Sequence, residues 1–156
     1  MKIGIIVYSH TGHTFSVAVA LREKLSAAGH AVNLERVEIH GPDGPGVTNV
    51  SLKTRPRIDT YSALVFASPV RGGVVSPAMT SYLEQIVSLQ GKKVVCLVTH
   101  FFPPAWGANQ TIAQMKSMCE SKGATVCGSG DVGWPRLGNK WRINAVVDDL
   151  TNCFRM

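Results

Sequence analysis

Three short runs of the chain are apolar at consecutive positions instead of alternating ones. They are residues 3–8, 63–67 and 94–98, with the sequences IGIIVY, ALVFA and VVCLV. Consecutive apolar positions rich in β-branched residues are typical of strands that are buried on both faces of a parallel sheet. Two weaker strand patterns follow at residues 31–39 and 124–130. The sequence therefore predicts five strands.

Helical patterns separate these strands, with small and apolar side chains recurring at steps of three and four. Gly29 supplies a left-handed stop for the first helix, and Ser76 followed by Pro77 is a favourable start for the second. The expected helices are residues 14–28, 76–91, 109–123 and 137–154.

The alternation of strands and helices predicts one domain over residues 1–156, an α/β doubly wound parallel sheet between two layers of helices. Residues 40–57 do not fit this pattern, because they are rich in glycine and proline. A crossover between parallel strands normally carries a helix. We therefore expect either a short helix or a long irregular loop in this stretch.

The charge and composition are those of an ordinary folded domain with a basic surface. The net charge is +6 and 45% of the residues are hydrophobic, as in an ordinary folded domain with a preference for anionic partners. The basic residues form no long stripe, so we expect a solvated basic surface and no nucleic-acid interface. No apolar run approaches the roughly 20 residues that span a bilayer, and the N-terminal residues do not show the pattern expected of a secretory signal. A cytoplasmic location is expected.

The cysteines give no sign of a metal site or a disulfide scaffold. They have no Cys-x-x-Cys spacing and no clustered histidines. The four cysteines are Cys96, Cys119, Cys127 and Cys153. We expect no metal.

A hydroxyl-rich loop, residues 8–14 with the sequence YSHTGHT, follows the first strand. In doubly wound sheets ligands bind beyond the carboxyl ends of the strands, and a helix that starts there presents N–H groups to an anion. Ser9, Thr11 and Thr14 add hydroxyl donors, and Gly12 lets the main chain come close. Because the loop holds no lysine or arginine, it is suited to a phosphate monoester held by neutral donors. The alternative is a hydroxyl-rich helix cap with nothing bound.

The sequence lacks the residues that several other classes of phosphate-binding or phosphate-transferring protein require. No aspartate stands near the end of the first strand, no Cys-x5-Arg cradle follows it, and Gly-Lys-Ser/Thr is absent. Residues 128–133, GSGDVG, match Gly-x-Gly-x-x-Gly, but Trp134 and Pro135 follow where a helix would have to start. We interpret this segment as a glycine-rich turn after the last strand.

The Tyr-Ser-x-Thr-Gly-x-Thr loop resembles the FMN-phosphate loop of flavodoxin-like proteins. That resemblance implies a five-stranded sheet in the order 2-1-3-4-5, a three-layer α/β/α sandwich and FMN as cofactor. It also implies that the FMN phosphate is wrapped by Ser9, His10, Thr11, Gly12, His13 and Thr14.

Two later segments resemble the flavin-ring loops of the same superfamily. Residues 67–79 are similar to the Ser-Pro-x-Arg-x-Gly loop of flavodoxin-like NAD(P)H:quinone reductases, and residues 99–111 more loosely to the loop that closes the ring site. The matching positions of the first are Pro69, Val70, Arg71, Gly72 and Gly73. Those of the second are Thr99, His100, Phe101, Phe102, Trp106 and Gly107, among which the aromatic rings offer flat apolar surfaces.

The resemblance leads us to expect an FMN-binding redox protein that transfers electrons through the flavin. An FMN-dependent NAD(P)H:quinone-type oxidoreductase is the alternative, and a flavin-free module for phosphate ligands is the third possibility. A redox partner protein, either acidic and ferredoxin-like or a reductase, or a small quinone would exchange electrons with it. Arg71 beside the ring would raise the flavin potential. We expect the three histidines near the site, His10, His13 and His100, to be surface residues, with His10 or His100 as the alternative donor to the flavin.

Overall fold

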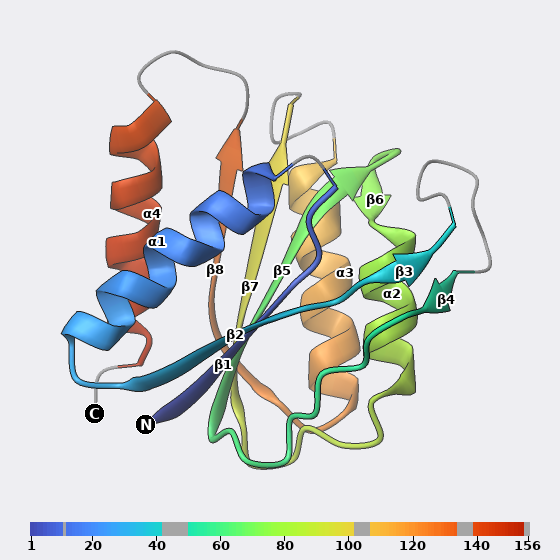
Figure 1. The fold of residues 1–156 in the computed structure, drawn as a ribbon, viewed down its shortest axis with the longest axis horizontal. Helices are drawn as coiled ribbons and strands as arrows, with labels where there is room; N and C mark the ends of the chain where they lie inside the picture. Colours follow the sequence, from blue (N-terminus) through green and yellow to red (C-terminus); the bar gives the residue numbers. More distant parts are fainter. Residues whose placement is uncertain (11, 42–49, 102–106, 134–138, 155–156) are drawn as a thin grey trace.

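The structure is a computed structural model that describes residues 1–10, 12–41, 50–101, 107–133 and 139–154. Five parallel strands form its sheet in the order β2-β1-β5-β7-β8, which confirms the expected order 2-1-3-4-5 (Figure 1). A short strand β6 (Val74–Val75) pairs antiparallel with the end of β5. The five parallel strands are β1 (Lys2–Val7), β2 (Ala31–Arg36), β5 (Ala63–Arg71), β7 (Lys93–His100) and β8 (Thr125–Gly133).

Helices cover both faces of the sheet and create two separate apolar cores. The helices α1 (His13–Ala27) and α4 (Asn139–Asn152) lie on one face, and α2 (Pro77–Gln85) and α3 (Ala108–Ser121) lie on the other (Figure 1). The side chains of β1 alternate between the cores, with Ile5 in the α1/α4 core and Ile6 in the α2/α3 core. None of the helices in the described ranges has the length and apolar character needed to cross a bilayer.

The second helix ends earlier than the sequence predicts, at Gln85 instead of Gly91. Ile86 is already extended, with φ −69° and ψ 128°. The Lys122 ammonium, from the end of α3, donates to the carbonyl oxygen of Ile86 at 2.6 Å and lies 3.4 Å from that of Glu84. A cation from another helix thus satisfies the last carbonyls of α2, an interaction that local sequence does not reveal.

The glycine-rich stretch after β2 holds a small antiparallel ladder of β3 (Ile39–His40) and β4 (Ser51–Leu52). Residues 50–58, here called the strap, then run beside α2 toward β5. Partly buried side chains of the strap, among them Leu52 and Ile58, pack against the α2/α3 core. The described part of this stretch contains no helix, so of the two expectations the irregular connection is the one found there; residues 42–49 lie outside the described ranges.

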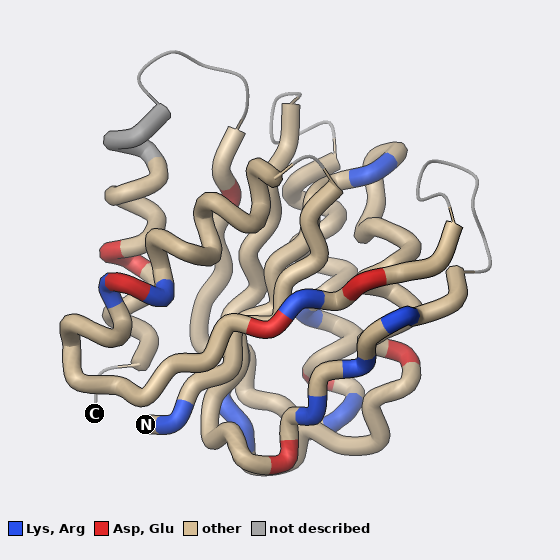
Figure 2. The backbone as a smooth tube through the Cα atoms, in the orientation of Figure 1, with Lys and Arg blue, Asp and Glu red and all other residues tan. Residues whose placement is uncertain are grey.

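Basic residues gather on the strap (Figure 2). Lys53, Arg55 and Arg57 alternate along it and are exposed. Arg57 pairs with Asp59 at 2.9 Å, and the Lys53 ammonium lies 3.9 Å from the Glu38 carboxylate. Exposed pairs of this kind contribute little to stability, so this basic segment is mainly a solvated surface.

Residues 128–133 lie within β8 and do not form a turn, so the interpretation of GSGDVG as a turn after the last strand was wrong. Gly128 and Gly130 face α4, where a Cβ would lie 2.3 Å from Cys153 Sγ and 2.7 Å from Val146 Cγ1, respectively. These glycines allow α4 to pack directly on the backbone of the edge strand. The strand also carries an irregularity, because the register skips Cys127 between Val94 and Val95 of β7.

We predict that Gly130→Ala lowers the free energy of unfolding by about 1–3 kcal/mol, because the new methyl group overlaps the β-branched and buried Val146. Chemical denaturation measures the change. Val146→Ala in the same chain should relieve part of the loss, giving a non-additive double-mutant cycle. Ser129→Ala, at an exposed neighbouring position, serves as the control and should change little. Equal effects of the two single alanine variants at 129 and 130 would contradict the packing argument.

Candidate functional site

The carboxyl ends of β1, β5 and β7 surround a small cleft of about 50 Å³ at the start of α1. All three strands are parallel, so their carboxyl ends meet at one edge of the sheet. The described residues that line the cleft are His10, His13, Thr14, Pro69, Val70, Arg71, Thr99, His100 and Phe101. The structure thus brings together residues from all three loops that the resemblance singled out.

The first loop turns around the hydroxyl group of Ser9. The backbone N–H groups of Gly12 and Phe15 both point to Ser9 Oγ, at 3.0 and 3.3 Å. Gly12 has φ 95°, in the left-handed region that glycine adopts without strain. Ser9 therefore caps the start of α1 and, because its oxygen accepts both bonds, its own proton is available to an acceptor outside the helix. Thr11 lies outside the described residues.

Thr14 and Thr99 form a buried hydroxyl pair at the floor of the cleft. Their Oγ1 atoms are 2.7 Å apart, and the residues are 1% and 3% exposed. One hydroxyl donates to the other, so together they retain one further proton to donate. The pair fixes the first turn of α1 to the end of β7, which makes Thr14 a structural link as well as a cleft residue.

A tight hairpin holds Arg71 at the rim of the cleft. Val70 pairs with Val75 and Arg71 with Val74, which leaves Gly72 and Gly73 as a two-residue turn. Their φ angles of 61° and 80° match the primed turn that suits a hairpin, and this turn requires glycine-like residues. Gly107, before α3, lies against the hairpin, since a Cβ there would be 2.9 Å from Gly73 Cα. The predicted site residues Gly72, Gly73 and Gly107 thus lie together beside the hairpin but are not among the residues that line the cleft.

His100 forms a hydrogen bond with Asp131, a contact that the sequence pattern did not predict. Its Nε2 lies 2.7 Å from Oδ2 of Asp131, and the two side chains are only 8% and 21% exposed. Asp131, in β8, pairs with Val98 of β7, and His100 lies two residues further along β7. Because residues 128–133 were interpreted as a turn, the aspartate was not placed beside the site. If the strand had been predicted to continue to Gly133, Asp131 would have been placed beside His100.

The other two histidines differ in surroundings. His10 is exposed, whereas His13 is half-buried and meets the ring of Phe101 edge-on, with 5.5 Å between the ring centroids. Phe101 itself is 57% exposed, so an apolar ring lies open to solvent beside the cleft. Phe102 and Trp106 lie outside the described residues. Over the described part of the chain, no group of His, Cys, Asp and Glu side chains is placed to hold a metal ion.

We predict that Thr14→Val lowers the free energy of unfolding by about 1–3 kcal/mol, because it leaves the buried Thr99 hydroxyl without its partner. The double variant Thr14→Val with Thr99→Val should cost less than the sum of the two single changes, since both hydroxyls are then replaced by methyl groups. Thermal or chemical unfolding of all four proteins measures the coupling. Strictly additive losses would show that the two hydroxyls do not interact.

The fold is shared with solved structures at low sequence identity. No protein-family model matches the sequence, and no curated protein matches it. Oxidised flavodoxin 1 from Bacillus cereus superposes with a TM-score of 0.73 at 13% identity, over 99% of this chain and 97% of that one. Oxidised flavodoxin 2 from the same organism gives 0.70 at 20% identity, over 99% and 100%. A flavoprotein in complex with FMN from Lactobacillus acidophilus NCFM gives 0.63 at 15% identity, over 93% and 97%. The chain has the flavodoxin-like fold.

Proposed function

We propose that this protein binds FMN at the carboxyl edge of its sheet and transfers electrons through the bound flavin. The observation that supports this most is the arrangement at the start of α1, where two backbone N–H groups converge on Ser9 Oγ. This arrangement lies at the ligand-binding edge of a fold shared with a flavoprotein solved with FMN. Fold alone does not carry a function, so the proposal depends on these residues.

The residues present fit the phosphate end of FMN. Gly12 has open space beside its Cα, since nothing lies within 4 Å of a Cβ built there. The amides of Gly12 and Phe15 and the hydroxyl of Ser9 are donors, and the helix start favours negative charge. A phosphate oxygen that replaced Ser9 Oγ as acceptor, or accepted its proton, would meet complementary groups in both cases.

The residues around the cleft fit the flavin ring in chemical character. Pro69, Val70 and Phe101 offer apolar surface, and Arg71, Thr14 and Thr99 supply polar groups. A cleft of about 50 Å³ is much smaller than the roughly 300–1,000 Å³ of typical cofactor sites. We therefore expect side chains at its mouth, among them the exposed Phe101, to move when the ring binds.

When bound, FMN would supply the electron-transfer chemistry, and the chain would orient it and set its potential. Arg71 lines the cleft, so its permanent positive charge would lie near a ring bound there. A cation stabilises added negative charge, so Arg71 would raise the reduction potential. This feature also favours the second candidate, an FMN-dependent NAD(P)H:quinone-type oxidoreductase, in which the flavin accepts a hydride.

The two candidates are separated by anaerobic mixing of the FMN-loaded protein with NADH or NADPH. Direct loss of absorbance near 450 nm, at a rate that saturates with nucleotide, would favour the oxidoreductase. Loss of absorbance only after a flavodoxin reductase is added would favour the electron carrier. If the protein does not bind FMN but binds another phosphate ester, the result would favour the third possibility, a flavin-free module for phosphate ligands.

We predict that the protein binds FMN much more tightly than riboflavin, because only FMN carries the phosphate that the α1 start would hold. Calorimetry with both ligands measures the difference. Ser9→Ala should weaken FMN binding by about tenfold and leave riboflavin binding unchanged. Ser26→Ala, at the exposed far end of the same helix, is the matched control. Absence of heat with FMN in the unaltered protein would refute the proposed function.

We also predict that Arg71→Ala lowers the midpoint potential of bound flavin by about 20–40 mV, the equivalent of about 1–2 kcal/mol for a two-electron couple. A dye-coupled redox titration measures the midpoint. Arg55→Ala removes an exposed cation from the strap and should leave the potential unchanged. If both variants keep the original midpoint, Arg71 does not act on the flavin.

A further inference from the structure

We propose that Arg36, at the end of β2, supplies the positive charge for the phosphate end of the ligand at the start of α1. This inference rests on the proposed function and adds to it a binding residue that lies outside the phosphate loop. It also revises the expectation that neutral donors alone hold the phosphate.

The sheet register places Arg36 beside the phosphate loop. Arg36 pairs with Val7, the last residue of β1, and the loop begins one residue later at Tyr8. The two strands are parallel, so both end at the same edge of the sheet. An arginine 22 or more residues away from the loop in sequence therefore lies next to it in space.

The side chain of Arg36 reaches the first turn of α1. Its guanidinium carbon lies 4.6 Å from the centroid of the Phe15 ring. Phe15 is the residue whose backbone N–H donates to Ser9 Oγ. A guanidinium stacked on an aromatic ring keeps its N–H donors free at the rim of its plane, where they can meet phosphate oxygens.

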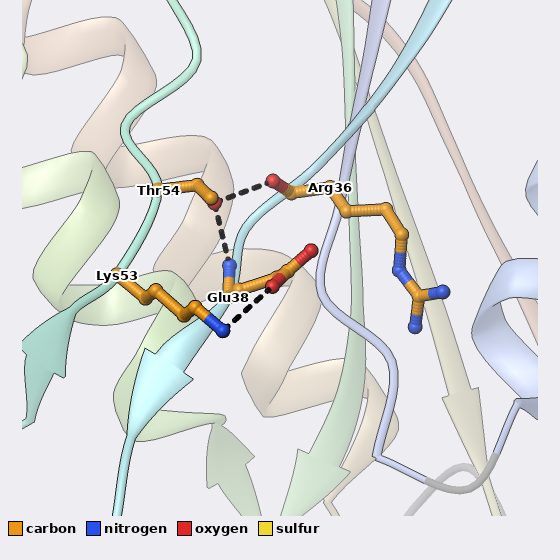
Figure 3. A network of polar contacts seen from close by, with 4 residues as sticks. All are labelled: Arg36, Glu38, Lys53 and Thr54. Atoms are coloured by element: carbon orange, nitrogen blue, oxygen red, sulfur yellow. Dashed lines mark hydrogen bonds and ion pairs between the residues drawn. The ribbon is translucent and has the colours of Figure 1, made fainter.

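The strap holds the main chain of Arg36 in place. Thr54 Oγ1 donates to the carbonyl oxygen of Arg36 at 2.7 Å and accepts the Glu38 N–H at 2.8 Å. Figure 3 shows Thr54 between these two groups, while the Arg36 side chain extends away from the strap. The direction of the side chain is thus set by an anchored backbone and by its contact with Phe15.

The acidic neighbours of Arg36 have other partners. The Tyr61 hydroxyl donates to Glu35, and Glu38 lies near the Lys53 ammonium. The first turn of α1 contains no acidic residue. Within the described ranges Arg36 forms no ion pair and is exposed, so its charge is available to an anion from outside the chain.

A purely structural role would look different in solution. If Arg36 only covers Phe15, its replacement would alter the stability of α1 but affect FMN and riboflavin binding equally. If it serves the phosphate, its replacement would change FMN binding alone. The ratio of FMN affinity to riboflavin affinity is therefore a measurement that a loss of packing against Phe15 would not change.

The experiment compares the dissociation constants of FMN and riboflavin for the unaltered protein, Arg36→Gln, Arg36→Lys and the control Arg55→Gln. We expect Arg36→Gln to weaken FMN binding about tenfold, with riboflavin binding unchanged and a weaker dependence of FMN affinity on salt. Arg36→Lys should recover much of the affinity, because it keeps the charge. Arg55→Gln should match the unaltered protein. An unchanged ratio of FMN to riboflavin affinity in Arg36→Gln would overturn the proposal.

Failure of the proposed function gives a separate result. If the unaltered protein binds no FMN, inorganic phosphate becomes the probe, followed through the amide NMR signals of Gly12 and Phe15. Phosphate-dependent shifts that disappear in Arg36→Gln would support the role of Arg36 at an anion site without flavin. Shifts of equal size in both proteins, or none in either, would refute it.

Discussion

Parallel pairing of β1 between β2 and β5 is the constraint on which the rest of the structure depends. Because β1 is buried on both faces, its register with each neighbour is fixed by the side chains that enter the two cores. That register brings the ends of three strands to one edge of the sheet. β1 and β2 stop side by side at Val7 and Arg36, whereas β5 continues past Ala67 to its hairpin, so the loop after β1, Arg36 and the hairpin all lie at this edge.

The site is built from short contacts between segments far apart in sequence. Thr14 of α1 pairs with Thr99 of β7, Gly107 lies against the Gly72–Gly73 turn, and His100 pairs with Asp131 of the edge strand. The first and third contacts tie α1 and β8 to β7, and the second ties the start of α3 to the hairpin after β5. The cleft is therefore rigid at its floor, while the exposed Phe101 at its mouth is the part that can adjust.

The sequence predicted the features that depend on local pattern and missed those that depend on partners elsewhere in the chain. Consecutive apolar residues identified β1, β5 and β7, and the hydroxyl-rich loop was placed at the correct edge. The end of α2 was missed because Lys122 comes from another helix. The length of β8 was missed because its glycines resemble a turn, although they serve close packing against α4. Asp131 and Arg36 were missed because their positions depend on the pairing of strands.

The skipped residue Cys127 has a further consequence at the border of the sheet. β8 is an edge strand, and edge strands expose a row of unpaired N–H and C=O groups to which another chain can add. An extra residue in that row bends the strand and interrupts its regular spacing. The irregularity between Val126 and Gly128 thus shortens the straight segment along which a foreign strand could pair.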